Sequence, residues 1–185
     1  KVILLEGDSH AASISGVITE AAINSNQNLV ICLKECLSRF GLESLIQRYK
    51  ITTVVSMRQY PSIPSAGYEA IEDLAKRNPV ITVVLIADNP SFEGWSAPAI
   101  FGPKSIPEKR DDVEVSQFGA LTRLTQLDRD LENVRMVPVL DLLCGSVNCE
   151  TEIDGRIVYS DDNHLSAFGA QLLAHRINSA LMSTP

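Results

Sequence analysis

The sequence predicts a flavodoxin-like three-layer α/β/α fold, in which helices cover both faces of a five-stranded parallel sheet. Short apolar, β-branched segments alternate with longer segments whose apolar residues recur every three or four positions. The chain has 185 residues and a hydrophobic content of 45%, which suits one domain with a full core. We therefore expect residues 1–185 to form a single domain.

The first part of the chain contains two strand–helix units. Residues 2–5 are an apolar run, and residues 10–23 carry apolar side chains at helical spacing. A polar break at 24–28 ends that helix. Residues 29–32 predict a short buried strand, and the apolar positions of 36–49 predict the second helix.

The middle of the chain predicts the central strands. Residues 51–57 are β-branched and apolar, as in a strand buried on both faces. A helical pattern follows at 68–76, and residues 80–87 form the most strand-like segment of the sequence. A Pro-, Gly- and Ser-rich loop then runs from Asp88 to about Asp111 and holds the only tryptophan, Trp95. Loops of this length in compact domains are often functional, so we expect it to shape a binding cleft.

The last part repeats the strand–helix pattern. A helix is expected at 115–131 and the fifth strand at 134–139. The final helix starts near Ser166 and presents one apolar face. Strands and helices therefore alternate from end to end, which favours a parallel sheet.

A candidate nucleophile lies directly after the first strand, in the stretch Gly7-Asp8-Ser9-His10. Gly7 allows a sharp turn, and Ser9 is expected where the first helix begins. Free backbone N–H groups and the positive end of the helix dipole surround that position and favour an oxyanion. In open α/β sheets, ligands bind at the carboxyl ends of strands. Asp8 and Ser9 are also good N-cap residues, so a purely structural role remains open.

A candidate base lies near the other end of the chain. Of the three histidines, His175 is expected at the surface of the last helix and His10 is expected to point into the first helix. His164 follows Asp161 by three residues in a loop. A nucleophilic serine needs an imidazole to accept its proton and a carboxylate to fix the imidazole tautomer, so Asp161 and His164 fit Ser9.

The same polar residues leave two alternatives open. Asp162 could supply the carboxylate, although adjacent side chains tend to point apart. A metal-dependent phosphoesterase could use Asp8 and His10 together with Asp161, Asp162 and His164 to hold two metal ions. Such sites usually contain more histidines than this chain has.

Composition limits the partners. The net charge is -7 and no Lys/Arg cluster is present, so nucleic acid and anionic membrane surfaces are poor candidates. No apolar run approaches the roughly 20 residues of a membrane span, and no signal peptide is visible. The sequence starts at Lys1 directly within a strand, so we expect a domain of a longer protein or a mature form.

The four cysteines form two close pairs. Their CxxxC and CxxxxC spacings match common zinc sites poorly. We expect the disulfides Cys144–Cys149 and Cys32–Cys36, which indicate an oxidising compartment. Free buried thiols remain the alternative.

These motifs together resemble a known family. Gly7-Asp8-Ser9 and Asp161-x-x-His164 resemble the first and last blocks of the SGNH (GDSL-type) hydrolases. The resemblance is closer to the SGNH domain fused to acyltransferase 3 membrane proteins, which O-acetylate bacterial surface glycans. It spans the chain in order and is carried by Gly7-Asp8-Ser9-His10, the late cysteine pair, Tyr159-x-Asp161-x-x-His164-Leu165-Ser166 and Gly169-Ala170.

The resemblance implies a serine-dependent O-acetyltransferase with an acyl-Ser9 intermediate, His164 as general base and Asp161 as orienting acid. It implies no cofactor and no metal. The acceptor would be a cell-surface glycan, and the acetyl ester donor would come from a covalently linked membrane acyltransferase domain. The domain would be the C-terminal part of that protein, extracytoplasmic, tethered to the membrane through a preceding domain, and monomeric in isolation.

The chain departs from the family pattern at the oxyanion hole. Arg58-Gln59-Tyr60 stands where Gly-x-Asn-Asp is expected, and no glycine comes directly after residues 29–32. The remaining candidate donors are the Ser9 backbone N–H and the side chains of Arg58 and Gln59. Two alternatives therefore stay open, namely a carbohydrate acetyl esterase and a non-catalytic glycan-binding module.

Overall fold

The computed structural model describes residues 1–33, 41–59, 65–92 and 107–182. Five parallel strands form one sheet in the order β2-β1-β3-β4-β6, as predicted. The strands are β1 (Val2–Gly7), β2 (Asn28–Leu33), β3 (Thr53–Met57), β4 (Thr82–Ile86) and β6 (Val134–Val137).

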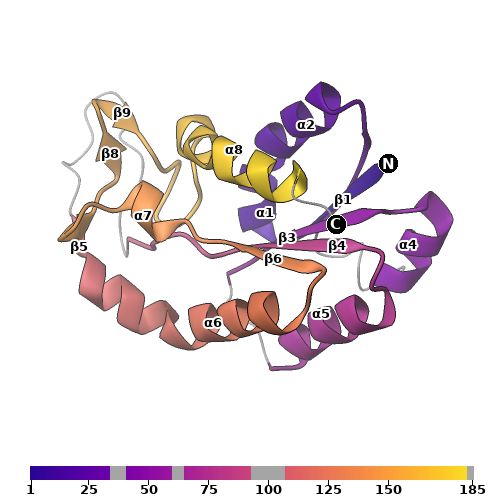
Figure 1. Ribbon diagram of the computed structural model, residues 1–185. Helices are drawn as coiled ribbons and strands as arrows, with labels where there is room; N and C mark the ends of the chain where they lie inside the picture. Colours follow the sequence, from indigo (N-terminus) through magenta and orange to yellow (C-terminus); the bar gives the residue numbers. More distant parts are fainter. Residues whose placement is uncertain (34–40, 60–64, 93–106, 183–185) are drawn as a thin grey trace.

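Helices cover both faces of the sheet, which completes the predicted three-layer fold (Figure 1). One face carries α1 (Ser9–Ser13), α2 (Ser15–Asn24) and α8 (Ala167–Met182). The other face carries α5 (Ser65–Arg77) and α6 (Arg110–Asp130). An ion pair of 2.8 Å between Arg77 and Glu43 joins α5 to α4 (Leu42–Tyr49).

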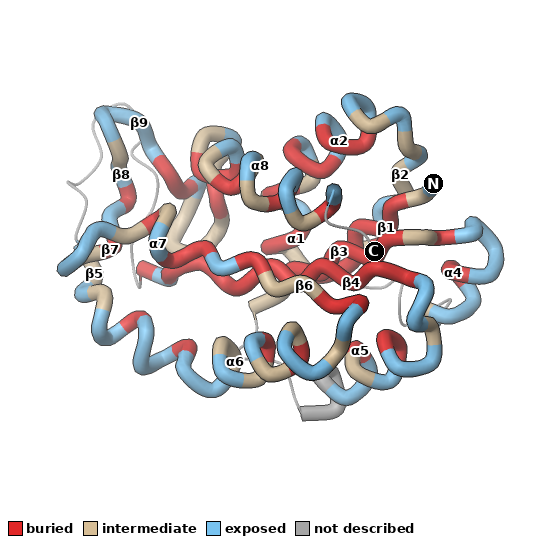
Figure 2. Tube along the Cα trace, viewed as in Figure 1, coloured by how far each residue is buried: buried red, intermediate tan, exposed pale blue. Residues whose placement is uncertain are grey.

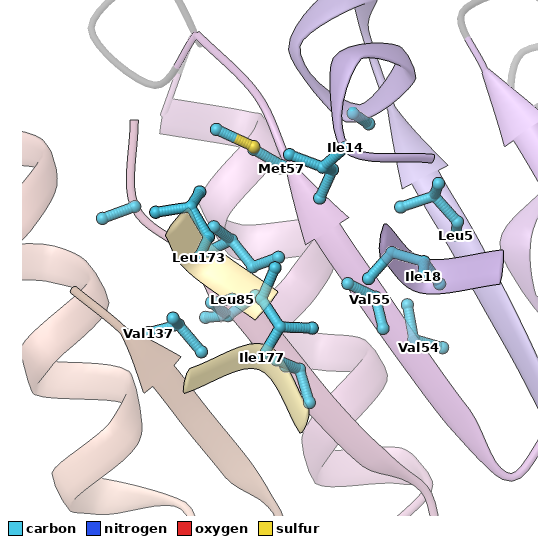
Figure 3. Packing of buried hydrophobic residues seen from close by; sticks show 14 of the residues in the cluster. Leu5, Ile14, Ile18, Val54, Val55, Met57, Leu85, Val137, Leu173 and Ile177 are labelled. Carbon is cyan, nitrogen blue, oxygen red and sulfur yellow. The ribbon is translucent and has the colours of Figure 1, made fainter. Parts of the chain in front are cut away.

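The core lies between the sheet and these helices. Every residue of β3 and β4 is buried, whereas the edge strand β2 is partly exposed (Figure 2). Figure 3 shows apolar side chains of α2 and α8 packed against the central strands. Ile18, Leu173 and Ile177 belong to these helices and are fully buried. The continuous apolar strands of the sequence are thus the strands covered on both faces.

The strand register places several loops at one edge of the sheet. Gly7 lies opposite Met57, Met57 lies opposite Ile86, and Ile86 lies opposite Val137. The chain therefore leaves β1, β3, β4 and β6 at the same level. Small elements gather at this end, at the left of Figure 1: α7 (Leu140–Leu143), the β5 (Glu108–Lys109) and β7 (Asn148–Cys149) pair, and the β8 (Glu152–Ile153) and β9 (Arg156–Ile157) pair.

Several expected boundaries differ from the structure; α5, for example, begins at Ser65 rather than at 68. The first helix is divided at Ile14, whose backbone has φ -96° and ψ 0°. The fourth expected helix, α6, begins at Arg110 rather than at 115. Its first turn is charged and has no apolar periodicity, so the sequence pattern did not indicate that turn. The expected helix at 36–49 is described from Leu42 onward, and its earlier part lies outside the described residues, as does Trp95.

The disulfide predicted between Cys144 and Cys149 is present. It closes the segment between α7 and β7. Cys32 is buried and is not a free thiol, but its predicted partner Cys36 lies outside the described residues, so that pairing stays a prediction. In the part of the chain that the structure describes, no helix combines the length and apolar character needed to cross a membrane.

Candidate active site

The turn between β1 and α1 presents Ser9 at the edge of the sheet. Gly7 has a φ of +147°, and Ser9 is the half-buried first residue of α1. Asp8 is the N-cap: its Oδ1 accepts the N–H of His10 at 2.9 Å, and its Oδ2 accepts the N–H of Gln59 at 3.0 Å. Asp8 therefore fixes the turn to the segment that follows β3. The Ser9 N–H lies in the first turn, where the helix supplies no acceptor.

The loop before α8 pairs His164 with Asp161. His164 Nδ1 lies 2.8 Å from both carboxylate oxygens of Asp161. The backbone N–H groups of Asn163 and His164 donate to Asp161 Oδ1 at 3.1 and 2.8 Å. Burial alone would raise the pKa of Asp161, but these N–H groups and the imidazole outweigh it and lower that pKa below its usual 3.8. An ionised Asp161 places the imidazole proton on Nδ1, which leaves Nε2 free to accept a proton.

That acceptor nitrogen is enclosed by the protein. Among the residues described, nothing forms a hydrogen bond with the buried Nε2 of His164. The His164 ring meets the ring of His10 edge-on, with centroids 5.1 Å apart. Because His10 follows Ser9 directly, the turn after β1 lies close to the His164 loop, and the pairing of Ser9 with His164 itself stays a prediction. Serine–histidine contacts often shorten only when substrate binds.

The segment after β4 anchors this loop. Phe92 N–H donates to the carbonyl of Asp162 at 2.6 Å, and Asn89 Nδ2 donates to the carbonyl of Asn163 at 2.8 Å. The rings of Phe92 and Tyr159 pack edge-on with centroids 4.8 Å apart. Asp162 therefore contributes its carbonyl to the anchor, while Asp161 supplies the carboxylate that contacts His164.

The residues after His164 fix the start of α8. Ser166 Oγ accepts the N–H of Gly169 at 3.1 Å and donates to the carbonyl of Ile157 at 2.7 Å. A Cβ at Gly169 would lie 2.0 Å from the carbonyl oxygen of Val158, so only glycine fits there. Ser166 and Gly169, which belong to the sequence motif around His164, therefore fix the position at which α8 begins.

A second histidine–carboxylate pair lies inside the site. His10 Nδ1 lies 2.7 Å from Asp88 Oδ1, and the two residues are 2% and 5% exposed. Sequence reasoning placed His10 in the first helix without this partner, so the expectation for its side chain is wrong. Asp88, two residues beyond the end of β4, carries no local signal that links it to His10. Burial lowers the pKa of His10, but the hydrogen bond and charge of Asp88 outweigh it and raise that pKa above 6.5.

The two predicted side-chain donors of the oxyanion hole lie at different places. The guanidinium of Arg58 forms an ion pair with the buried carboxylate of Glu6. The Gln59 side chain lines a cleft beside Asp88. The role of both residues in an oxyanion hole stays a prediction.

The sequence model of a family described as "SGNH domain (fused to AT3 domains)" matches residues 43–179. The chain belongs to this SGNH family. No relative was found among curated protein sequences.

Solved structures share the fold of this SGNH domain. The periplasmic domain of a lipopolysaccharide acetyltransferase from Salmonella ser. Paratyphi A is 12% identical with a TM-score of 0.62, over 98% of this chain and 84% of that chain. A GDSL-like lipase candidate from Parabacteroides merdae is 13% identical with a TM-score of 0.53, over 97% and 94% of the two chains. The SGNH domain therefore shares its fold with both of these proteins.

The residues of the metal-dependent alternative have other partners. Asp8 accepts two backbone N–H groups, and His10 Nδ1 contacts Asp88. Within residues 1–33, 41–59, 65–92 and 107–182, no three His, Cys, Asp or Glu side chains are grouped to hold a metal ion.

The His10–Asp88 pair is expected to make the stability of the SGNH domain pH-dependent. Burial also raises the pKa of Asp88, against the hydrogen bond from His10, so the folded pair binds more protons than the unfolded chain. Stability then falls as pH rises. The His10 contribution is fully present below about pH 6.5 and is lost as pH rises through the raised pKa. The free energy of unfolding of Asp88→Asn, measured with urea above and below this pH, should change less with pH than that of the parent protein.

The exposed Asp111 supplies the control for this experiment. Asp111→Asn removes one carboxylate without touching His10 and should reproduce the parent curve. Identical pH dependences for the parent and Asp88→Asn would show that the pair is not a proton-linked element.

Proposed function

We propose that this SGNH domain transfers acetyl groups to hydroxyls of a bacterial cell-surface glycan through an acetyl ester on Ser9. The observation that carries the proposal is the Nε2 atom of His164. It is buried with no hydrogen-bond partner among the described residues, its ring is held by Asp161, and that ring packs edge-on against the ring of His10, the residue after Ser9. A buried acceptor without a donor is costly, and a serine hydroxyl is the donor that nucleophilic catalysis would bring there.

The first half-reaction forms the ester. His164 Nε2 takes the proton of Ser9 Oγ while Oγ attacks the acetyl carbonyl carbon of the donor. The bond between that carbon and the donor oxygen breaks, and the donor oxygen leaves with the proton from His164. Asp161, ionised through its lowered pKa, stabilises the imidazolium in between.

The second half-reaction passes the acetyl group on. A glycan hydroxyl gives its proton to His164, its oxygen bonds to the acetyl carbon, and the bond to Ser9 Oγ breaks. Oγ then recovers the proton from His164. The Ser9 N–H, with Arg58 or Gln59, would stabilise the oxyanion of each step. Water in place of the glycan hydroxyl would make the same site a carbohydrate acetyl esterase.

The comparisons support a place for this chemistry in a larger protein. The family description names fusion to AT3 domains, which supports a covalently linked membrane acyltransferase domain as the source of the acetyl group. The periplasmic acetyltransferase domain of similar fold supports an extracytoplasmic location. Residues 1–185 would then be one exported, monomeric domain, with the membrane attachment in a preceding segment.

Ser9 labelling tests the proposed nucleophile. A fluorophosphonate should modify the parent protein once, at Ser9, and the modification should disappear in Ser9→Ala. Incubation with an acetyl ester followed by rapid acid quenching should add the mass of one acetyl group to the same peptide. A protein that folds but takes neither label would be a glycan-binding module, and the proposed function would be wrong. Release of acetate without transfer to any added glycan would identify the esterase.

A further inference from the structure

A polar cleft lies beside the candidate active site. Its volume is about 360 Å³, within the range of small-molecule sites. It is bounded by the segments after β3 and β4, by β5 and by the first half of α6, and Asp88 belongs both to its wall and to the His10 pair. The described lining residues are Gln59, Asp88, Asn89, Ser91, Glu108, Asp112, Val113, Ser116 and Gln117.

The buried amides of this cleft have unused acceptors. Asn89 and Gln117 are 2% and 4% exposed. Asn89 Nδ2 donates to the carbonyls of Pro90 and Asn163, and Gln117 Nε2 donates to the carbonyl of Asn89. These donors fix both amide orientations, because a flipped amide would set two oxygens against each other. Within the part of the chain that the structure describes, Asn89 Oδ1 and Gln117 Oε1 are buried and have no hydrogen-bond partner.

The charged groups of the cleft are acceptors as well. Asp88, Glu108 and Asp112 line it, and the described lining residues include no lysine or arginine. Ionised carboxylates only accept hydrogen bonds. A ligand that pairs with the hydrogen-bond acceptors of this cleft must donate hydrogen bonds through hydroxyl or ammonium groups. A carboxylate or phosphate on the ligand would instead face like charge and unmatched acceptors.

We infer that this cleft is the acceptor subsite and takes an uncharged or amino sugar, while it rejects uronic acids and phosphorylated sugars. The assignment as an acceptor subsite rests on the proposed transfer reaction, because the sugar hydroxyl must reach Ser9. The geometry connects the two: the cleft wall at Asp88 contacts His10, and His10 adjoins both Ser9 and His164.

Titration with simple sugars tests this inference. Amide resonances of Asp88, Asn89, Ser91 and residues 112–117 are followed by NMR while methyl glucoside, glucosamine or glucuronate is added. Methyl glucoside and glucosamine should shift these resonances, and glucuronate should bind at least about tenfold more weakly, a difference of roughly 1.4 kcal/mol. Equal or tighter binding of glucuronate, or shifts confined to other regions, would overturn the inference. So would a response to calcium chloride in the absence of any response to sugars.

Two matched variants sharpen the result. Asp112 lines the cleft and is exposed, so Asp112→Asn should preserve the fold and narrow the discrimination against glucuronate. Asp111→Asn removes the neighbouring carboxylate, which does not line the cleft, and should leave the discrimination unchanged. Equal behaviour of the two variants would refute the assignment.

Failure of this inference can be told apart from failure of the proposed function. Sugar binding needs no chemistry and is measured on Ser9→Ala as well as on the parent protein. If Ser9 is labelled but sugars bind without selectivity for charge, the cleft is not the acceptor subsite, while Ser9 remains the proposed nucleophile. Sugar binding with an unreactive Ser9 would reject the transfer reaction and its acceptor, and would leave a glycan-binding cleft.

Discussion

Ser9→Ala is expected to lower the turnover of an acetyl ester by roughly 10⁴- to 10⁶-fold, because the acyl-enzyme can no longer form. His164→Ala should cost about as much, since the hydroxyl then has no base. The double variant should be no slower than either single variant, because residues that act as one unit are not additive. Initial rates with an acetyl ester, measured at equal concentrations of folded protein, check all three.

The exposed His175 provides the control for the histidine substitution. His175→Ala removes an imidazole from α8 and should leave the rate within about twofold of the parent, as for a surface change far from a site. Turnover by Ser9→Ala close to that of the parent protein would exclude Ser9 as the nucleophile. Additive losses in the double variant would show that Ser9 and His164 act separately.

The sheet could be predicted from the sequence because its signals are local. Strands β3 and β4 are rich in β-branched and apolar residues and are buried along their whole length. Parallel strands bring their carboxyl ends to one edge, and the register of Gly7 with Met57 shows this directly. The contact between the rings of His10 and His164 is consistent with that topology, although 154 positions separate the two residues.

The parts that escaped prediction depend on contacts between distant segments. The His10–Asp88 pair joins residues 78 positions apart, and nothing in the local pattern of either one indicates the other. The anchoring of Asn163 by Asn89 is of the same kind, with 74 positions between them. The division of the first helix at Ile14 lacks the glycine or proline that usually signals a break at that position.

These distant contacts also suggest how the site is held without the usual third family block. Where the pattern expects Gly-x-Asn-Asp after β3, this chain has Arg58 and Gln59. The backbone of Gln59 holds Asp8 of the turn that bears Ser9, and the segment after β4 holds the His164 loop through Asn89 and Phe92. Positioning is therefore divided between two strand ends, which a search for one local motif does not reveal.

Gly7→Ala is expected to lower the free energy of unfolding by more than about 3 kcal/mol, the largest stability effect of any single methyl group considered. A Cβ at Gly7 would lie 2.1 Å from the carbonyl oxygen of Met57 and 2.7 Å from Ala11 Cβ. The carbonyl belongs to the neighbouring central strand, so it cannot move without disturbing the sheet. The φ of +147° adds backbone strain for any residue with a side chain.

Gly16→Ala is the matched control, because an added Cβ at that exposed helical position meets nothing within 4 Å. It should raise the free energy of unfolding by up to about 1 kcal/mol through the higher helix propensity of alanine. Urea unfolding curves of the two variants should therefore move in opposite directions from the parent curve. Equal midpoints would mean that the β1–α1 turn can relax around a side chain. In that case the close approach of Gly7 to Met57 does not determine the position of Ser9 at the end of β3.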